Sequence, residues 1–382
     1  MKKVIILFWV ILCFSQVAYA QDTNQEEILE EQKDSLNISD FIQQAEEYTE
    51  NEFQDIDMNE LLNEALTGKI DNSNLGKSLW NLLGKEVKES LTILGSILAI
   101  IIIHSIIKSI GESLENENVA KITYYVQYIL IAVLIISSFS NIVEMVRESV
   151  QNMIGFTQCL IPLLMTLLLT TGSITSAGLI QPILLFTISL MANLFQMVIL
   201  PFILISTALA IVSKLSDKIQ IDKIAKFMKS STIWVMGIIL TIFVGILSIE
   251  GTLSSSVDGI TAKTAKAAVS NIIPVVGKVL GDAVDTVIGC SSILKNAVGV
   301  VGIVVILSIC VAPILKLTIL TIAYHLTAAV AEPISDGKIV KLLEQMGDTF
   351  KILLAVLCVM AVILVIGLTL VVKISNSGLM YR

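Results

Sequence analysis

Three ionisable residues interrupt long apolar stretches of the sequence, and they are the first candidates for chemistry. Lys316 lies between Pro313 and His325 in one apolar block, while His104 lies in another. Placing a lysine at the centre of a membrane costs about 2.5–3.5 kcal/mol on insertion scales, so such a lysine marks a candidate site. Lys316 is either a pore-lining or coupling charge, or a lysine that extends its charge to the surface from a hairpin turn. The two histidines suit interhelical hydrogen bonds or proton transfer.

No combination of residues typical of an enzyme site is present in the sequence. The two histidines have no Cys, Asp or Glu at metal-ligand spacing, and the Walker A, GxSxG and HExxH patterns are absent. The five cysteines include no CxxC pair, which indicates small buried packing residues rather than redox or metal chemistry. We therefore expect no enzymatic activity, no cofactor and no metal. Any energy would come from another protein or from an ion gradient.

The apolar blocks themselves predict an all-α, polytopic membrane protein. The chain has 382 residues, of which 55% are hydrophobic and 15% charged, whereas soluble domains are about 25% charged. Blocks such as 91–107, 233–249 and 352–372 approach or reach the roughly 20 apolar residues that cross a lipid bilayer as a helix. Backbone groups in lipid must bond within their own segment, and the alternating pattern of a β-barrel is absent. We expect seven to nine spans.

Residues 1–20 have the three parts of a secretory signal peptide. A basic pair, Lys2 and Lys3, precedes an apolar run that is too short for an ordinary membrane span, and residues 18–20 (Ala-Tyr-Ala) offer a cleavage site. We expect the leader to be cleaved, with an uncleaved anchor as the alternative. In both cases the residues that follow lie outside the cytoplasm.

Residues 21–88 form an acidic extracytoplasmic segment. Within it, residues 21–80 hold 16 acidic side chains and 3 lysines, which argues against nucleic-acid binding because that requires a basic surface. Two apolar stripes predict short amphipathic helices, and Asp57 with Glu60 three residues later resembles a capping box. The segment either docks on an extracytoplasmic partner or forms a solvated stalk. The stripes are Ile38, Phe41, Ile42 and Ala45, then Leu61, Leu62, Ala65 and Leu66.

Residues 89–253 hold the first group of membrane helices, which lysine placement orients across the bilayer. The segment 90–109 would enter the cytoplasm and 122–140 would leave it. The charged stretch 141–153 is then an external loop. The lysine-rich stretch 214–230 is expected to face the cytoplasm.

The next span, 156–172, returns inward under this topology. For its end and the lysine-rich stretch both to face the cytoplasm, the block 179–213 must cross the membrane an even number of times. We therefore favour a helical hairpin that turns near Asn193 over one long helix kinked at Pro201.

Residues 254–297 form an amphipathic module that we place outside the cytoplasm. Apolar residues from 276 to 288 recur at the spacing of an amphipathic helix, with Asp282 and Asp285 on its polar face. Such a helix can lie in the membrane interface, line a pore when several copies of the chain gather, or pack as a lid on the bundle. C-terminal membrane helices follow in 298–382. The number of crossings there, and the side of the C-terminus, stay open.

Short motifs run from the module to the end of the following apolar block. They are NIIPVVG at 271–277, Asp282, DTV at 285–287, KNAVG at 295–299, APILK at 312–316, YHLTAAV at 324–330 and EP at 332–333. These motifs resemble the stage III sporulation protein AE family of endospore-forming bacteria. The leader, the acidic segment and the multi-span body fit the same family. The motif positions that we single out are Asn271, Pro274, Gly277, Asp282, Asp285, Lys295, Asn296, Gly299, Pro313, Lys316, His325 and Pro333.

The resemblance implies a membrane subunit of a channel or secretion-like complex between mother cell and forespore, required for forespore development. It implies a place in the mother-cell membrane around the forespore. The implied partners are other stage III A sporulation proteins, including a secretion-type ATPase and ring-forming subunits. The family has no agreed catalytic residues, so a role of the motif positions in lining a conduit is our hypothesis. The alternatives are a secondary transporter that acts alone, coupled through Lys316 or His325, and a structural membrane scaffold.

Overall fold

A computed structural model describes most of the chain from residue 27 onward. The signal-peptide prediction and His104 lie outside the described residues, and side chains between 251 and 285 are not described. The described residues are 27–49, 57–68, 84, 86–88, 90–92, 94–103, 105–106, 117–215, 221–272, 276–335 and 337–379.

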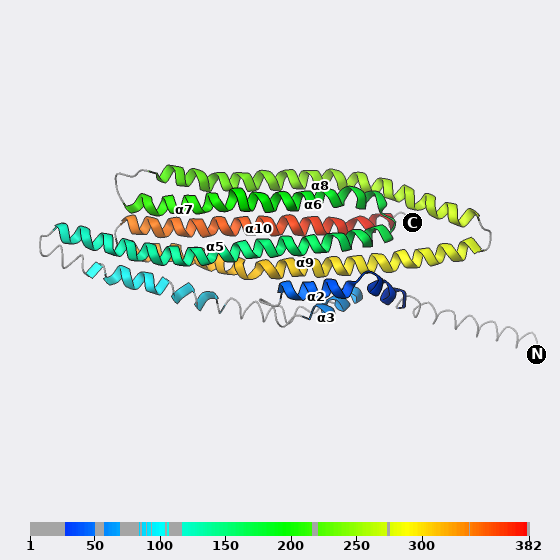
Figure 1. Ribbon diagram of the computed structural model, residues 1–382, viewed down its shortest axis with the longest axis horizontal. Helices are drawn as coiled ribbons and strands as arrows, with labels where there is room; N and C mark the ends of the chain where they lie inside the picture. Colours follow the sequence, from blue (N-terminus) through cyan, green and yellow to red (C-terminus); the bar gives the residue numbers. More distant parts are fainter. Residues whose placement is uncertain are drawn as a thin grey trace, which may run out of the picture.

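Long helices lie side by side in one elongated bundle, and successive helices run in opposite directions (Figure 1). Five helical segments in the described part of the chain are long and apolar enough to cross a membrane, judged by length and composition. No strand occurs among the described residues, so the prediction of an all-α, polytopic membrane protein is confirmed. The long elements are α5 (Glu117–Thr170), α6 (Ile174–Leu194), η1 (Phe195–Ile199), α7 (Leu200–Leu215), α8 (Asp222–Ile272), α9 (Val276–Ala331) and α10 (Gly337–Leu379).

The external loop predicted at 141–153 is wrong, because α5 continues through it as helix. Charged side chains end an apolar run, but they do not end a helix, and this stretch contains neither proline nor glycine. Glu144 and Arg147 instead face each other on the helix surface at 3.8 Å. The spans predicted at 122–140 and 156–172 are therefore two halves of one helix.

The hairpin predicted at 179–213 is also wrong. Elements α6, η1 and α7 form one helical rod that does not turn at Asn193. The π-helical turn η1 ends two residues before Pro201, and the N–H of Leu200 donates to the carbonyl of Phe195. Proline lacks an N–H and its ring crowds the carbonyl four residues earlier, so the wider π turn accommodates it without a break. The hairpin was predicted because α5 was counted as two spans. Since α5 is one rod, a single pass along α6 and α7 brings the chain to the lysine-rich stretch at 214–230.

Helix α9 shows whether the block 298–331 passes along the bundle once or folds back, which the sequence left open. It runs without interruption through Pro313 and Lys316, so the block 298–331 passes once along the bundle. A hairpin turn at Lys316, one of the two interpretations of that residue, is therefore wrong. The region treated as a separate module, 254–297, consists of the end of α8, an undescribed joint and the beginning of α9.

The span count of seven to nine is not confirmed. Helix α5 has 54 residues, which corresponds to a length of about 81 Å, although about 20 residues already cross a bilayer. Single helices thus hold stretches that were counted as two spans. The segment 90–109 is helical where it is described, but it is not described throughout.

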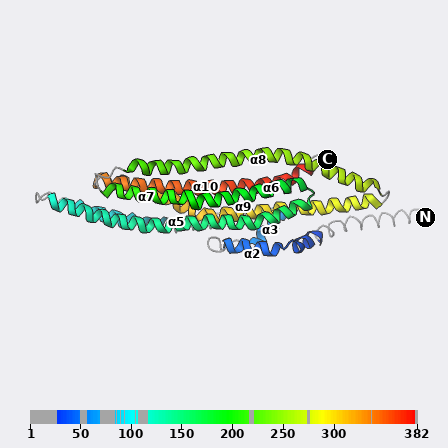
Figure 2. The same ribbon diagram turned by 45° about the horizontal axis from the view of Figure 1, so that its top comes forward.

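Two short helices of the acidic segment pack on the bundle, on the side away from α8 (Figure 2). These are α2 (Ile38–Thr49) and α3 (Met58–Thr67), and the apolar stripes predicted for them are buried or partly buried. Asp57 caps α3 by accepting hydrogen bonds from the N–H groups of Asn59 and Glu60. The segment is therefore docked on its own bundle in this part, rather than a free stalk.

Candidate functional site

The predicted motif positions are distributed along the bundle and do not form one site. Lys295 and His325 lie 30 positions apart on α9, which separates them by about 45 Å along the helix axis. Pro274 lies outside the described residues, and Gly277 lies in the first turn of α9. The conduit hypothesis for the module stays a prediction, because the side chains of Asn271, Asp282 and Asp285 are not described.

Lys295 is the most deeply buried charged residue among these positions, with 0% of its surface exposed. Its Nζ donates hydrogen bonds to the backbone carbonyls of Val371, at 3.3 Å, and Val372, at 2.8 Å, both on α10. No carboxylate in the described part of the chain pairs with it. Burying an ammonium group is costly unless its donors are satisfied, and here the carbonyls of a neighbouring helix satisfy them.

Gly299 lies one turn after Lys295 and faces the same helix. A Cβ atom at Gly299 would collide with a methyl group of Val372, and one at Gly302 would collide with a methyl group of Leu160 on α5. These glycines let α9 approach α10 and α5 closely, which is how membrane helices commonly gain packing contacts. The role of Gly299 is thus packing.

Lys316 forms an ion pair with Glu86, whose carboxylate oxygen lies 3.1 Å from Nζ. The side chains are 23% and 10% exposed, so the pair is largely shielded from solvent. Glu86 was missed by the sequence analysis, because it lies 230 positions from Lys316 and no local pattern links them. The pair joins the helical stretch before α5 to the middle of α9.

His325 lies near Asp348 of α10, with Nε2 and Oδ1 3.7 Å apart. A Cβ at Gly347 would lie 2.9 Å from the same ring nitrogen, so the imidazole packs directly on the α10 backbone. One turn away, Lys229 of α8 donates to the carbonyl of Gln345 at 2.9 Å and to Oγ1 of Thr349 at 2.7 Å. Three helices thus meet through polar contacts at this level.

The remaining motif positions have varied surroundings. The Oδ1 atom of Asn296 is buried and has no hydrogen-bond partner among the described residues. Pro313 is buried inside α9, and Pro333 is exposed in the turn between α9 and α10. The buried position of Lys229 was not foreseen, because its neighbours in sequence form the lysine-rich stretch expected in the cytoplasm.

The docked acidic segment contacts α5 at Gly155 and Phe156. The rings of Phe41 and Tyr48 pack on Phe156, with centroids 6.0 and 5.7 Å away. A Cβ at Gly155 would lie 2.8 Å from the Tyr48 hydroxyl, so only glycine admits this contact without a shift. Burial raises the pKa of the Tyr48 phenol, and nearby Cys159 and Glu47 raise it further.

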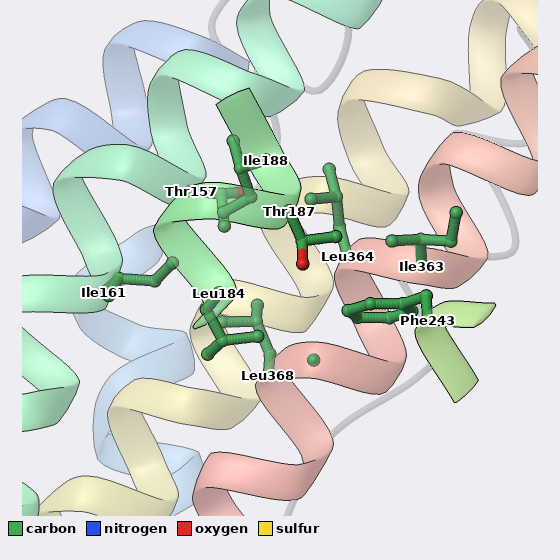
Figure 3. A pocket seen from close by; sticks show the side chains of 10 residues that line it. Thr157, Ile161, Leu184, Thr187, Ile188, Phe243, Ile363, Leu364 and Leu368 are labelled. Carbon is green, nitrogen blue, oxygen red and sulfur yellow. The ribbon is translucent and has the colours of Figure 1, made fainter. Parts of the chain in front are cut away.

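A small cavity lies between α5, α6, α8 and α10 (Figure 3). Its volume is about 10 Å³, which is room for at most one water molecule. Apolar side chains and two threonines, Thr157 and Thr187, line it. No group of three or more His, Cys, Asp or Glu side chains among the described residues is placed to hold a metal ion.

These features define a class: a multi-span helical membrane protein that buries polar contacts between long, tightly packed helices. The chain belongs to the stage III sporulation protein AE family, whose model matches residues 56–375. It is 30% identical over 306 residues to the stage III sporulation protein AE of Bacillus subtilis (strain 168), covering 80% of this chain and 77% of that protein. No solved structure matches it. Family membership assigns the protein a role in sporulation.

Proposed function

We propose that the protein is a non-enzymatic membrane subunit of an export or channel complex that links mother cell and forespore. It would lie in the mother-cell membrane around the forespore. Other stage III A proteins, including an ATPase and ring-forming subunits, would supply energy and the extracellular part of the path.

One observation carries this proposal beyond family membership. The cavity between α5, α6, α8 and α10 has a volume of about 10 Å³, whereas solute pockets are typically about 300–1,000 Å³. At Gly299 and Gly302, α9 approaches its neighbours so closely that a Cβ atom would collide with them. Helices packed this closely at these positions favour a wall of a larger path over a bundle that carries a solute alone.

The proposal is tested by complementation in a spore-forming bacterium that lacks its own stage III AE protein. Expression of the full chain should restore heat-resistant spores only when the other stage III A proteins are present. The proposal fails if the inserted chain restores no spores in the otherwise intact strain, or restores them without those proteins.

A secondary transporter is the second candidate, and the His325–Asp348 contact favours it. An imidazole and a carboxylate 3.7 Å apart on neighbouring helices are ionisable groups of the kind that proton-coupled transporters use. The transporter function requires solute or proton flux by the purified chain alone in liposomes. If correctly inserted protein gives no flux, the transporter function is excluded and the channel-subunit function is the one supported.

A further inference from the structure

Four long helices each contain a charge-free stretch of about 20 residues, which is the length that crosses a bilayer. On α5 one stretch, 122–143, precedes Glu144 and a second, 149–170, follows Glu148. The stretch on α8 is 230–249, and those on α9 and α10, 296–315 and 352–372, lie between lysines. Helix α6 contains no charged residue. Of the two α5 stretches, 149–170 contains Leu160, which lies against α9 within the stretch 296–315.

The charge-free stretches lie beside one another at one level of the bundle. Gly302 of α9 abuts Leu160 of α5, and Gly367 of α10 abuts Leu184 of α6 and Phe243 of α8. The small cavity has lining residues from four of these helices (Figure 3). Towards the other end of the bundle, α8 and α10 carry exposed charges, such as Lys226 and Lys341. The charge-free level is therefore where the hydrocarbon core of the bilayer fits.

At this level the outer face of α8 is apolar and suited to lipid. Ile233, Ile238 and Ile242 are exposed there, and Trp234, close to the lysine end, is 70% exposed. Tryptophan prefers the interface between hydrocarbon and headgroups, so its position agrees with that placement of the bilayer. One side of the bundle thus meets lipid.

The outer face of α5 is polar over much of this level and over about three turns before it. Its exposed positions recur every three or four residues, except where Tyr48 of α2 covers Gly155, so they form a stripe along one face of the helix. The stripe extends over residues 137–166, about 44 Å of helix, which is as long as a bilayer with its headgroups is thick. The exposed members of this α5 polar stripe are Ser137, Ser140, Asn141, Glu144, Arg147, Glu148, Gln151, Asn152, Gln158, Cys159, Pro162 and Thr166.

Helix α2 provides independent evidence that this side of the bundle meets water. It packs on the stripe through Tyr48 at Gly155, next to residues that line the central cavity. Its outward residues include Asp40, Glu46 and Glu47, which are exposed. Exposing several carboxylates to hydrocarbon is prohibitively costly, so α2 and the stripe cannot both face lipid at this depth.

We propose that the α5 polar stripe faces a water-filled path through the membrane, and that further copies of this chain close the path. Helices α5 and α8 lie on opposite sides of α10 (Figure 1), so the stripe and the apolar face of α8 belong to different sides of the bundle. One bundle cannot surround its own outer face. Copies arranged around an axis bring equivalent stripes together around water and leave every α8 in lipid. This inference rests on the proposed channel function, and it identifies the α5 polar stripe as the surface that lines the channel.

Thiol accessibility in membranes tests the water-filled path. In the full chain with all five cysteines (Cys13, Cys159, Cys290, Cys310 and Cys358) replaced by alanine, Asn152→Cys is compared with Ile242→Cys on α8. A charged methanethiosulfonate reagent reacts with thiols in water, so it should modify position 152 at least tenfold faster. Equal, slow reaction at both positions in inserted protein would overturn the inference.

Cross-linking of the same variants with a bismaleimide long enough to bridge a water-filled path tests the occupant of the stripe. The Asn152→Cys variant should give a cross-linked product of twice the chain mass, and the Ile242→Cys variant should not. A product that contains a different protein, or no product from position 152, would overturn the assignment to copies of this chain.

A third experiment separates failure of this inference from failure of the proposed function. The double substitution Gln151→Leu with Asn152→Leu replaces two exposed polar side chains of the stripe by apolar ones. It should lower spore yield at least tenfold. Suppose that the double leucine variant gives normal spore yield while the Asn152→Cys variant is labelled and cross-linked as expected. This result would refute the channel function but would support the water-facing assembly of copies. Normal yield without labelling would refute the inference itself.

Discussion

Lys295 donates a 2.8 Å hydrogen bond to the backbone carbonyl of Val372, and this bond joins α9 to α10 near one end of the charge-free level. The contact is reinforced one turn away, where Gly299 abuts the side chain of the same valine. Two positions of the KNAVG motif therefore act on one residue of a neighbouring helix. Lys295 and Gly299 of this motif are thus explained by the packing of α9 on α10.

Gly299→Ala should destabilise the protein. The added methyl group collides with Val372, and overpacking of this kind costs about 1–3 kcal/mol. Gly289→Ala is a matched control on the same helix, because a Cβ there meets nothing within 4 Å. The control should be neutral or slightly stabilising, since alanine favours helix over glycine. Thermal unfolding in detergent measures both, and equal melting temperatures would contradict the packing role.

Lys295→Met should fold about as well as the parent chain, because an apolar side chain of similar size removes a buried charge and leaves no charged group without a partner. Lys295→Glu should fail to accumulate in the membrane. Its carboxylate would face the carbonyls of Val371 and Val372, which accept hydrogen bonds and donate none. Membrane protein levels and melting curves compare the two. Severe loss of the methionine variant would show that the charge itself is required.

Glu86→Gln should destabilise the bundle by about 3 kcal/mol, because it leaves Lys316 largely buried without its carboxylate. The double variant Glu86→Gln with Lys316→Met should recover part of this loss, since neither charge remains. A double-mutant cycle on unfolding free energies isolates the coupling between the two residues. Strictly additive effects would mean that the ion pair contributes nothing.

Thr349→Val should cost about 1–3 kcal/mol, because it removes the hydroxyl that accepts a hydrogen bond from buried Lys229. Thr369→Val on the same helix provides the control. That hydroxyl is exposed and bonds only within its own helix, to the carbonyl of Val365, so its loss should stay within about 0.5 kcal/mol. The difference in melting temperature between the two variants is the measurement. A control as unstable as Thr349→Val would point to helix propensity instead.

The spacing of apolar residues correctly predicted the two short amphipathic helices, α2 and α3. The stripes from Ile38 to Ala45 and from Leu61 to Leu66, and the cap at Asp57, were predicted and are present. Helix ends within the membrane region were predicted poorly. The charged residues near Glu144 interrupt hydropathy without interrupting α5, and the π turn before Pro201 replaces the predicted turn of a hairpin.

The polar contacts between helices could be predicted only in part. Lys316 and His325 were identified because a charge or imidazole in an apolar block is unusual, whereas Lys295 was named only as part of the KNAVG motif. Their partners Glu86, Asp348 and the Val372 carbonyl come from distant positions, and a single sequence carries no signal for such pairs. The α5 polar stripe was missed for another reason. Its residues are spread three or four apart in a helix of high average hydropathy, so counting apolar blocks hides them.

The length of α5 sets how far the protein reaches from the lipid. A straight rod of about 81 Å would have to tilt by about 70° to fit within 30 Å of hydrocarbon, whereas membrane helices tilt by at most about 40°. With the bilayer at the proposed charge-free level, the half that begins at Glu117 would project past the headgroups, at the end of the bundle that carries the lysine-rich stretch. The proposed placement thus gives the protein a stiff arm that reaches beyond the bilayer surface and carries exposed apolar side chains such as Ile129 and Val133.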